Sequence, residues 1–111
     1  MHTKLIEYGQ GSSLRQQDYT QAAVRAVENA LWRNSIDLAG VFGVDRAAMR
    51  IRAEIGVQNP SAVDPDKVAA IFPYGTVAVS VVPGGLDIPK PDGGVTVLAL
   101  AALHVSLDGV A

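Results

Sequence analysis

Residues 49–57 alternate strictly between apolar and polar side chains, which is the pattern of a β-strand with one face against a core. Two further strands are predicted by residues 4–8, which end at a glycine, and by the Val-rich residues 76–82. Residues 95–106 are almost continuously apolar, as in a strand that is central in its sheet or covered on both faces. The pattern therefore predicts four strands.

A spacing of three and four residues replaces this alternation between the first two strands. It places apolar residues in one stripe and predicts a helix that runs to about Arg33. Asp18 precedes the stripe and is suited to cap the helix, and Gln21 stands where a capping box requires it. The stripe consists of Tyr19, Ala22, Ala23, Ala26, Val27, Ala30 and Leu31.

A second, short helix is predicted after Asp64, because this cap residue is followed by Pro65 at the first helical position. Pro73 ends it. Residues 34–47 are predicted to be a connector, and residues 83–94 a long loop that Pro and Gly residues stiffen.

The predicted order is β-α-β-α-β-β in a single domain that covers residues 1–111. Right-handed crossovers place both helices on the same face of the sheet. The expected fold is therefore of the α/β class in the broad sense, an α+β two-layer sandwich. It has a mixed four-stranded sheet with two helices on one face, and its other face is uncovered.

Composition suggests what covers that second face. Hydrophobic residues make up 49% of the chain and charged residues only 18%, so the apolar surface exceeds what two helices can cover. We therefore expect a homo-oligomer in which another copy masks part of the sheet. The alternative is a monomer with a strongly apolar core.

Charge and cysteine content exclude several classes of function. The net charge is −2 and no cluster of Lys and Arg is long enough to follow a phosphate backbone, so no nucleic-acid partner is expected. The chain has no cysteine, which excludes disulfides and thiol chemistry. The longest apolar run, residues 97–103, is too short to span a membrane, and residues 1–7 lack the long apolar stretch of a signal peptide, so neither a membrane span nor a signal peptide is expected. A cytoplasmic location is therefore expected. The two histidines, His2 and His104, are too far apart in the sequence to form a metal-binding motif, and no metal or cofactor is predicted.

The first candidate site is a glycine-rich loop before the long helix. Gly9 and Gly11 permit close approach to a backbone, and Ser12 and Ser13 offer hydroxyls beside the free N–H groups of the helix start. A dinucleotide fingerprint is incomplete, since Leu14 occupies the place of the third glycine. A small anion remains a candidate ligand, and a plain tight turn is the alternative interpretation.

The second candidate site is the polar face of the sheet. If the strands are neighbours, Glu7, Arg52 and Glu54 are expected to share one surface, with His104 or Ser106 from the last strand. This cluster could line a pocket where subunits meet. The alternative is a set of cross-strand ion pairs at an interface.

Several motifs in the chain resemble those of a family of conserved hypothetical proteins named after a Listeria locus. The family signature is G-x-G-x-D-x-H-G, and Gly9 and Gly11 match its first two glycines. The resemblance covers nearly the whole chain and implies no established activity. It is also carried by the residues from Gln17 to Ala26, Asn34-Ser35, Ile55-Gly56-Val57, Phe72-Pro73-Tyr74-Gly75 and Gly84-Gly85-Leu86.

The chain departs from this signature at three positions. Ser13 stands at the Asp position, Arg15 at the His position and Gln16 at the last glycine. If the family's Asp and His bind a metal or move a proton, this chain has lost both groups, which favours a binding or subunit role over catalysis. Ser13 and Arg15 could instead hold an anionic group at the helix start.

Three functions are consistent with these patterns. The first is a small homo-oligomeric binding or accessory protein with a cleft for an anion or small molecule at a subunit interface. The second is a hydrolase or deaminase of small amide or imine compounds, with Ser12 or Ser13 as nucleophile and Lys4 as base, because the architecture is similar to that of ring-opening amidohydrolases and imine deaminases. The third is a subunit that only stabilises an enzyme encoded elsewhere.

Overall fold

The computed structural model describes residues 5–33, 48–73 and 75–107. The predicted connector 34–47 lies outside them, as do His2, Lys4 and Tyr74. The elements are β1 (Leu5–Ser13), α1 (Tyr19–Arg33), β2 (Met49–Val57), a 3-10 turn η2 (Pro60–Ala62), α3 (Pro65–Ala69), β3 (Thr76–Pro83), β4 (Leu86–Pro89) and β5 (Val95–Leu107).

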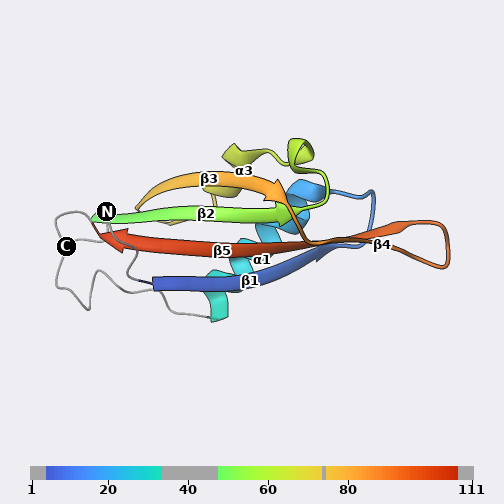
Figure 1. Ribbon diagram of the computed structural model, residues 1–111, viewed down its shortest axis with the longest axis horizontal. Coiled ribbons are helices and arrows are strands. Elements are labelled where there is room, and N and C mark those ends of the chain that lie inside the picture. Colours follow the sequence, from blue (N-terminus) through green and yellow to red (C-terminus); the bar gives the residue numbers. More distant parts are fainter. Residues whose placement is uncertain (1–4, 34–47, 74, 108–111) are drawn as a thin grey trace.

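The strands form one mixed sheet in the order β1-β5-β2-β3, and β4 pairs with the beginning of β5 (Figure 1). β5 is antiparallel to β1, β2 and β4, whereas β2 and β3 are parallel. The predicted α+β class is confirmed. The near-continuous apolar run also proves to be the central strand, because β5 has β1 on one side and β2 on the other.

The sheet has a fifth strand that the pattern did not predict, because the predicted loop 83–94 contains β4. After β3 the chain passes the end of β2 through Gly84 and Gly85. Gly85 has a φ of 61°, and a Cβ there would lie 2.1 Å from the carbonyl oxygen of Leu98. The glycine therefore lets the chain come close enough to pair with β5, and a turn at residues 90–94 closes the hairpin.

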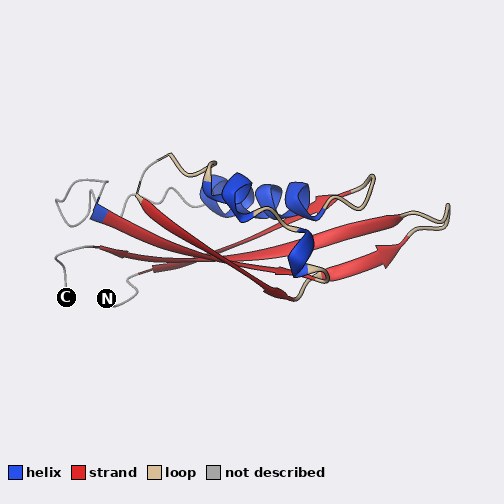
Figure 2. Ribbon diagram, turned by 90° about the horizontal axis from the view of Figure 1, so that it is seen from above, coloured by secondary structure: helices blue, strands red, loops and turns tan. Residues whose placement is uncertain are grey.

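Both helices lie over one face of the sheet (Figure 2). Asp18 caps α1 as predicted, with its carboxylate 3.0 Å from the N–H of Gln21, and Asp64 caps α3 through the N–H of Asp66. The Thr20 hydroxyl accepts a hydrogen bond from the N–H of Asp64, which ties the start of α3 to α1. The core lies between helices and sheet and includes the small stripe of α1 and the odd-numbered residues of β2 and β5.

β1 is longer than predicted, and the glycine-rich loop expected at residues 9–16 is mostly strand. A Cβ on Gly9 would lie 2.3 Å from the carbonyl oxygen of Ala26, and a Cβ on Gly11 would lie 2.3 Å from the Ala26 nitrogen. Glycine at both positions therefore lets the backbone of α1 pack directly on β1. The Gly-x-Gly pattern has a packing role here and forms neither a turn nor a ligand-binding loop.

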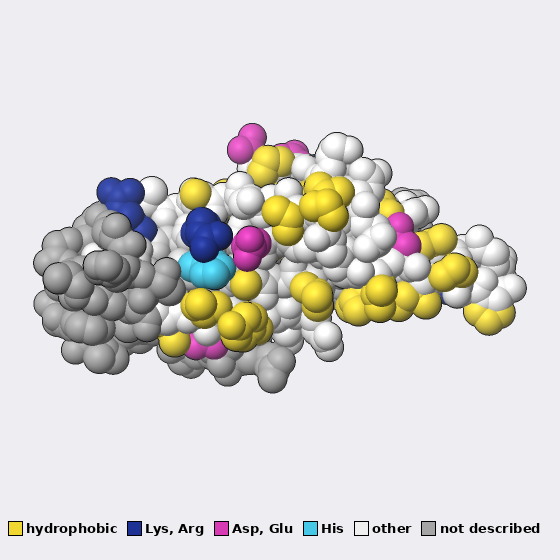
Figure 3. Space-filling view, in the orientation of Figure 1, with side chains coloured by type: hydrophobic (Ala, Val, Ile, Leu, Met, Phe, Trp, Pro, Cys, Tyr) yellow, Lys and Arg dark blue, Asp and Glu magenta, His cyan; other side chains and the backbone are white. Residues whose placement is uncertain are grey.

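The even-numbered strand residues point away from the helices and form a surface that we call the open face. Figure 3 looks onto it and shows several apolar side chains on this face. Among the described residues, seven large hydrophobic side chains are exposed, and all except Leu14 lie on this face. The six are Ile6, Tyr8, Val82, Leu86, Ile88 and Leu100.

The molecule is elongated, with extents of 52 × 24 × 19 Å. The β4–β5 hairpin forms one end of the long axis (Figure 1). Within the described ranges, no helix is both long enough and apolar enough to cross a membrane.

Candidate functional site

Three neighbouring strands bring polar side chains together on the open face. The register places Arg52 opposite His104, and Arg50 opposite both Ser106 and Thr76. These five residues, together with Ile51 and Ala78, line a hollow of about 220 Å³ that we call the cationic hollow. Two guanidinium groups, one imidazole and two hydroxyls make it a surface rich in hydrogen-bond donors.

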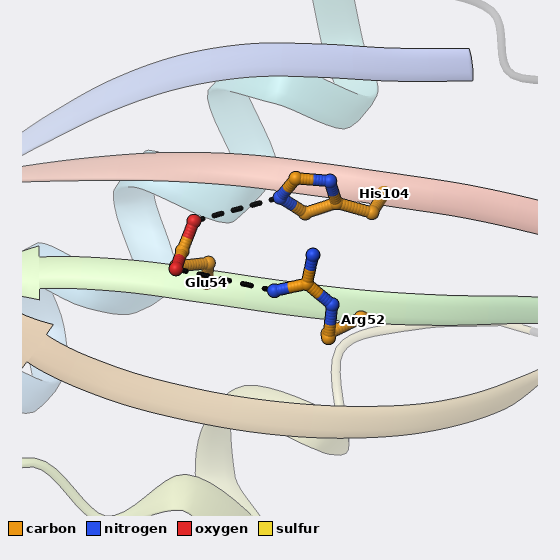
Figure 4. A network of polar contacts seen from close by, with 3 residues as sticks. All are labelled: Arg52, Glu54 and His104. Carbon is orange, nitrogen blue, oxygen red and sulfur yellow. Dashed lines mark ion pairs between the residues drawn. The ribbon is translucent and has the colours of Figure 1, made fainter. Parts of the chain in front are cut away.

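Glu54 lies at the border of the cationic hollow and contacts two of its residues (Figure 4). Its Oε1 is 3.5 Å from Nε2 of His104, and its Oε2 is 3.9 Å from Nη1 of Arg52. The imidazole is only 17% exposed, and its Nε2 makes no hydrogen bond within the described part of the chain. The three side chains therefore form an ion-pair cluster on an otherwise uncovered sheet.

A second hollow, of about 270 Å³, adjoins this cluster on the other side of Glu54. We call it the apolar hollow, because its walls are mainly hydrocarbon. It is lined by Tyr8, Glu54, Gly56, Val82, Leu100, Ala101 and Ala102. Since Gly56 pairs with Leu100 and with Val82, the missing side chain at this position leaves space between two apolar ones.

Glu7 does not share the surface of Arg52 and Glu54, so this part of the predicted cluster is wrong. Glu7 pairs with Leu103 and therefore lies on the helix side of the sheet. The open-face positions of β1 are Ile6 and Tyr8, which pair with His104 and Ala102. Side-chain direction in a strand follows position alone, so a charged residue can lie on the side that the pattern assigns to the core.

The serines and Arg15 lie far from the open-face cluster. Ser13 pairs with Val97, seven positions along β5 from His104, a separation of about 23 Å at the usual rise of a strand. Ser13 is fully buried, and its Oγ lies 3.1 Å from the carbonyl oxygen of Arg15 and 3.2 Å from Oε1 of Gln21. The structure thus separates the two candidate sites.

Arg15 lines another hollow, of about 380 Å³, at the beginning of α1, with Leu14, Gln16, Asp18, Gln21 and Arg25. The guanidinium of Arg25 donates a hydrogen bond of 2.7 Å to the carbonyl oxygen of Ser12. On the same strand, the N–H of Gln10 donates to Oδ1 of Asn29. Arg25 and Asn29 therefore satisfy backbone groups along the outer edge of β1.

The hairpin contacts the beginning of α1 through polar groups that sequence reasoning did not connect. The Tyr19 hydroxyl donates a hydrogen bond to the Asp87 carboxylate, and Nζ of Lys90 donates one of 2.7 Å to the carbonyl oxygen of Leu14. The hydrogen bond to Asp87, supported by burial, raises the pKa of Tyr19. These contacts join residues about 70 positions apart, for which the sequence carries no local signal.

Other residues of the cationic hollow were accessible to sequence reasoning. Arg50 and Arg52 share the parity of Glu54 in an alternating strand, so all three had to lie on one face. The contribution of Thr76 required the pairing of β2 with β3. In residues 5–33, 48–73 and 75–107, no group of three or more His, Asp or Glu side chains is placed to hold a metal ion.

Comparison with known proteins places the chain among proteins without an assigned activity. A family model described as conserved hypothetical protein (Lin0512_fam) matches residues 3–105. A crystal structure of an FtsZ-like protein of unknown function from Nostoc punctiforme is similar with a TM-score of 0.85 and 29% identity, over 94% of this chain and 93% of that chain. No curated protein is significantly similar to the chain.

Proposed function

Because the chain belongs to the Lin0512 family of conserved hypothetical proteins, we propose a function from its geometry: it is a small homo-oligomeric binding protein. Copies meet through the open face, and a small anion is held in the cationic hollow at the junction. The observation that carries this proposal is that exposed apolar side chains and a donor-rich hollow occupy the same uncovered face.

The apolar side chains support the assembly. Six of the seven exposed large hydrophobic residues of the described chain lie on the open face, and water-exposed apolar patches of this kind mark contact surfaces. A sheet face of this type is most simply covered by the same face of another copy, since a closed symmetric contact uses one patch twice.

The donor groups support the anionic ligand. Arg50 and Arg52 bring two positive charges into the cationic hollow, and Thr76, His104 and Ser106 add further polar atoms. Glu54 offsets part of this charge, since it lies near both Arg52 and His104. Guanidinium donors of this kind form charge-assisted hydrogen bonds with a small anion.

The hydrolase or deaminase interpretation is not favoured by a specific contact. Ser13 is fully buried, so its hydroxyl is not presented to a substrate. The suggested base, Lys4, lies outside the described residues, and the role of a purely stabilising subunit likewise stays a prediction. The expected cytoplasmic location remains part of the proposal.

The proposed assembly is tested by introducing a charge at Leu100. Leu100 and Leu14 are 47% and 57% exposed, but only Leu100 lies on the open face, so Leu14→Arg is a matched control. By light scattering, the wild type and Leu14→Arg should have at least twice the monomer mass of 11.6 kDa. Leu100→Arg should have the mass of a monomer. A monomeric wild type at micromolar concentration would contradict the assembly.

The proposed ligand class is tested with inorganic phosphate and acetate as probes, followed through the NMR signals of the His104 ring. Both anions should shift these signals, and Arg52→Gln should weaken the effect several-fold because a charge-assisted hydrogen bond is lost. Lys67→Gln, at an exposed position on α3, is the control. Unchanged His104 signals at millimolar concentrations of both anions would refute anion binding at this hollow.

A further inference from the structure

The two hollows of the open face lie on either side of one line across the sheet. The register defines four successive levels that cross the strands, each made of open-face residues that pair directly. The levels are, in order, Arg50 with Thr76 and Ser106; Arg52 with Ile6, Ala78 and His104; Glu54 with Tyr8, Ser80 and Ala102; and Gly56 with Gln10, Val82 and Leu100.

Residues of the first two levels other than Ile6 line the cationic hollow, and residues of the last two levels other than Ser80 and Gln10 line the apolar hollow. The dividing line runs between Arg52 and Glu54, which are adjacent open-face positions of β2. Opposite charges therefore stand immediately on either side of the line. This arrangement is self-complementary about a twofold axis that lies along the line.

Two copies can be placed open face to open face with that axis perpendicular to β2. β2 then crosses the partner's β2 in the opposite direction, so Arg52 faces the partner's Glu54 and Glu54 faces the partner's Arg52. An axis parallel to the strand would instead bring like charges together, which costs stability. Charge complementarity thus selects one arrangement and one occupant of the open face, a second copy of this chain.

The same rotation places the cationic hollow of each copy against the apolar hollow of the other. We propose that each such pair of hollows forms one binding site for a small organic monoanion with an apolar body, such as an alkyl carboxylate. A dimer has two identical sites, and neither copy holds a complete one. This inference rests on the proposed function and adds to it the partner's residues and the class of ligand.

The walls of the combined site determine this ligand class. Arg52, His104 and their neighbours bind the negatively charged head group, and the partner's Val82 and Leu100 cover the hydrocarbon part. The partner's Glu54 lies at the junction, where a second negative charge on the ligand would be repelled. Hollows of about 220 and 270 Å³ suit a molecule of modest size.

The contact between copies is tested by reversing the two charges separately. Arg52→Glu and Glu54→Arg should each be monomeric by light scattering, because each brings like charges together across the axis. An equimolar mixture of the two variants should form the dimer again, since the two acidic side chains of one variant then face the two basic side chains of the other. Lys67→Glu and Glu28→Arg reverse exposed charges on the helix side and should remain dimeric.

The outcomes of this experiment separate the two proposals. A monomeric wild type would overturn the proposed function and this inference together. A dimeric wild type whose charge reversals remain dimeric, or whose mixed variants stay monomeric, would overturn only the twofold contact. An ion pair confined to one chain predicts no rescue on mixing.

The ligand class is tested by calorimetry with butanoate, hexanoate and octanoate. Affinity should rise roughly fourfold for each methylene that the partner's apolar hollow buries. Hexylamine, which has the apolar body without the anion, should not bind, and inorganic phosphate should bind more weakly than hexanoate. Equal affinity for the three carboxylates would refute the apolar half of the site.

The contribution of two copies to one site is tested by mixing a His104→Ala variant with a Leu100→Ala variant, after light scattering shows that each is dimeric. Each variant alone should bind octanoate at least tenfold more weakly than the wild type. In a random mixture, one site of each mixed dimer combines two intact hollows, so about a quarter of all sites should regain wild-type affinity. If both hollows act within one chain, no high-affinity sites will return. Val82→Ala replaces Leu100→Ala if the latter is monomeric.

Discussion

Single residues show how closely this protein packs its two layers. Gly9 and Gly11 on β1 lie directly under Ala26 of α1, where even a methyl group would meet backbone atoms of the helix. Small residues on both elements therefore replace the interlocking side chains that usually separate a helix from a sheet. The resemblance to a ligand-binding glycine loop arose because glycine serves close approach to any group, including a helix backbone.

At this scale we predict that Gly11→Ala lowers the free energy of unfolding by about 3 kcal/mol, because the new Cβ forces α1 away from β1. Urea denaturation measures the change. When both substitutions are made in the monomeric Leu100→Arg variant, Gly56→Ala is the matched control, since a Cβ at this position makes only an ordinary contact at 3.4 Å and should cost less than about 1 kcal/mol. Equal effects of the two substitutions would contradict the close-packing role of Gly11.

At the scale of elements, the β4–β5 hairpin is attached to the beginning of α1. Asp87 on β4 pairs with Val97 and so lies on the helix side of the sheet, where Tyr19 reaches it. Gln17 donates a hydrogen bond of 2.9 Å to the Tyr19 hydroxyl. Nζ of Lys90 donates a hydrogen bond to the carbonyl oxygen of Leu14, which lies in the loop between β1 and α1. The segment predicted to be a loop is therefore a strand held by contacts at both of its ends.

This attachment should weaken in alkaline solution. The pKa of Tyr19 is raised above its ordinary value of 10.0, chiefly because its hydroxyl donates a hydrogen bond to Asp87 and secondly because it is buried. A raised pKa contributes stability that is present below pH 10.0 and is lost as the pH rises through the pKa of the folded state. Urea denaturation from pH 8 to pH 11 follows this loss.

We predict that Tyr19→Phe is less stable than the wild type at pH 8 and that the difference narrows above pH 10.0. Tyr8→Phe is the matched control when both substitutions are made in the monomeric Leu100→Arg variant, because Tyr8 is then exposed on the open face. Its stability should follow that of the wild type at every pH. A constant difference between Tyr19→Phe and the wild type would show that Tyr19 does not titrate with unfolding.

At the scale of the whole molecule, one strand organises the fold. β5 spans 13 residues and pairs with three other strands, whereas β1 and β3 form the edges of the sheet. Its odd-numbered residues from Val97 to Leu107 are buried under the helices. Such a strand loses its hydrogen bonds only when the whole sheet opens.

We therefore predict that the backbone amides of residues 97–105 are the slowest to exchange with deuterium, at a rate set by global unfolding. Amides of β3 should exchange at least tenfold faster, because one side of that strand has no neighbouring strand. NMR-detected hydrogen exchange on the monomeric Leu100→Arg variant makes the measurement independent of assembly. Equal protection of β3 and β5 would contradict the central role of β5.

The sequence by itself determined the elements whose pattern is local. The period of β2, the stripe and cap of α1 and the Asp64-Pro65 start of α3 were all predicted within a few residues, because each depends on neighbours in the chain. The order of the elements and the apolar composition also predicted a sheet face that the helices leave uncovered.

Only the tertiary structure decided the relations between distant segments. It assigned Gly9 and Gly11 to packing, placed Glu7 on the helix side, and joined Tyr19 to Asp87. It also aligned β1, β2, β3 and β5 so that a cationic and an apolar hollow share one face. These features depend on strand register, which is set by the packing of whole elements and not by the residues beside each strand.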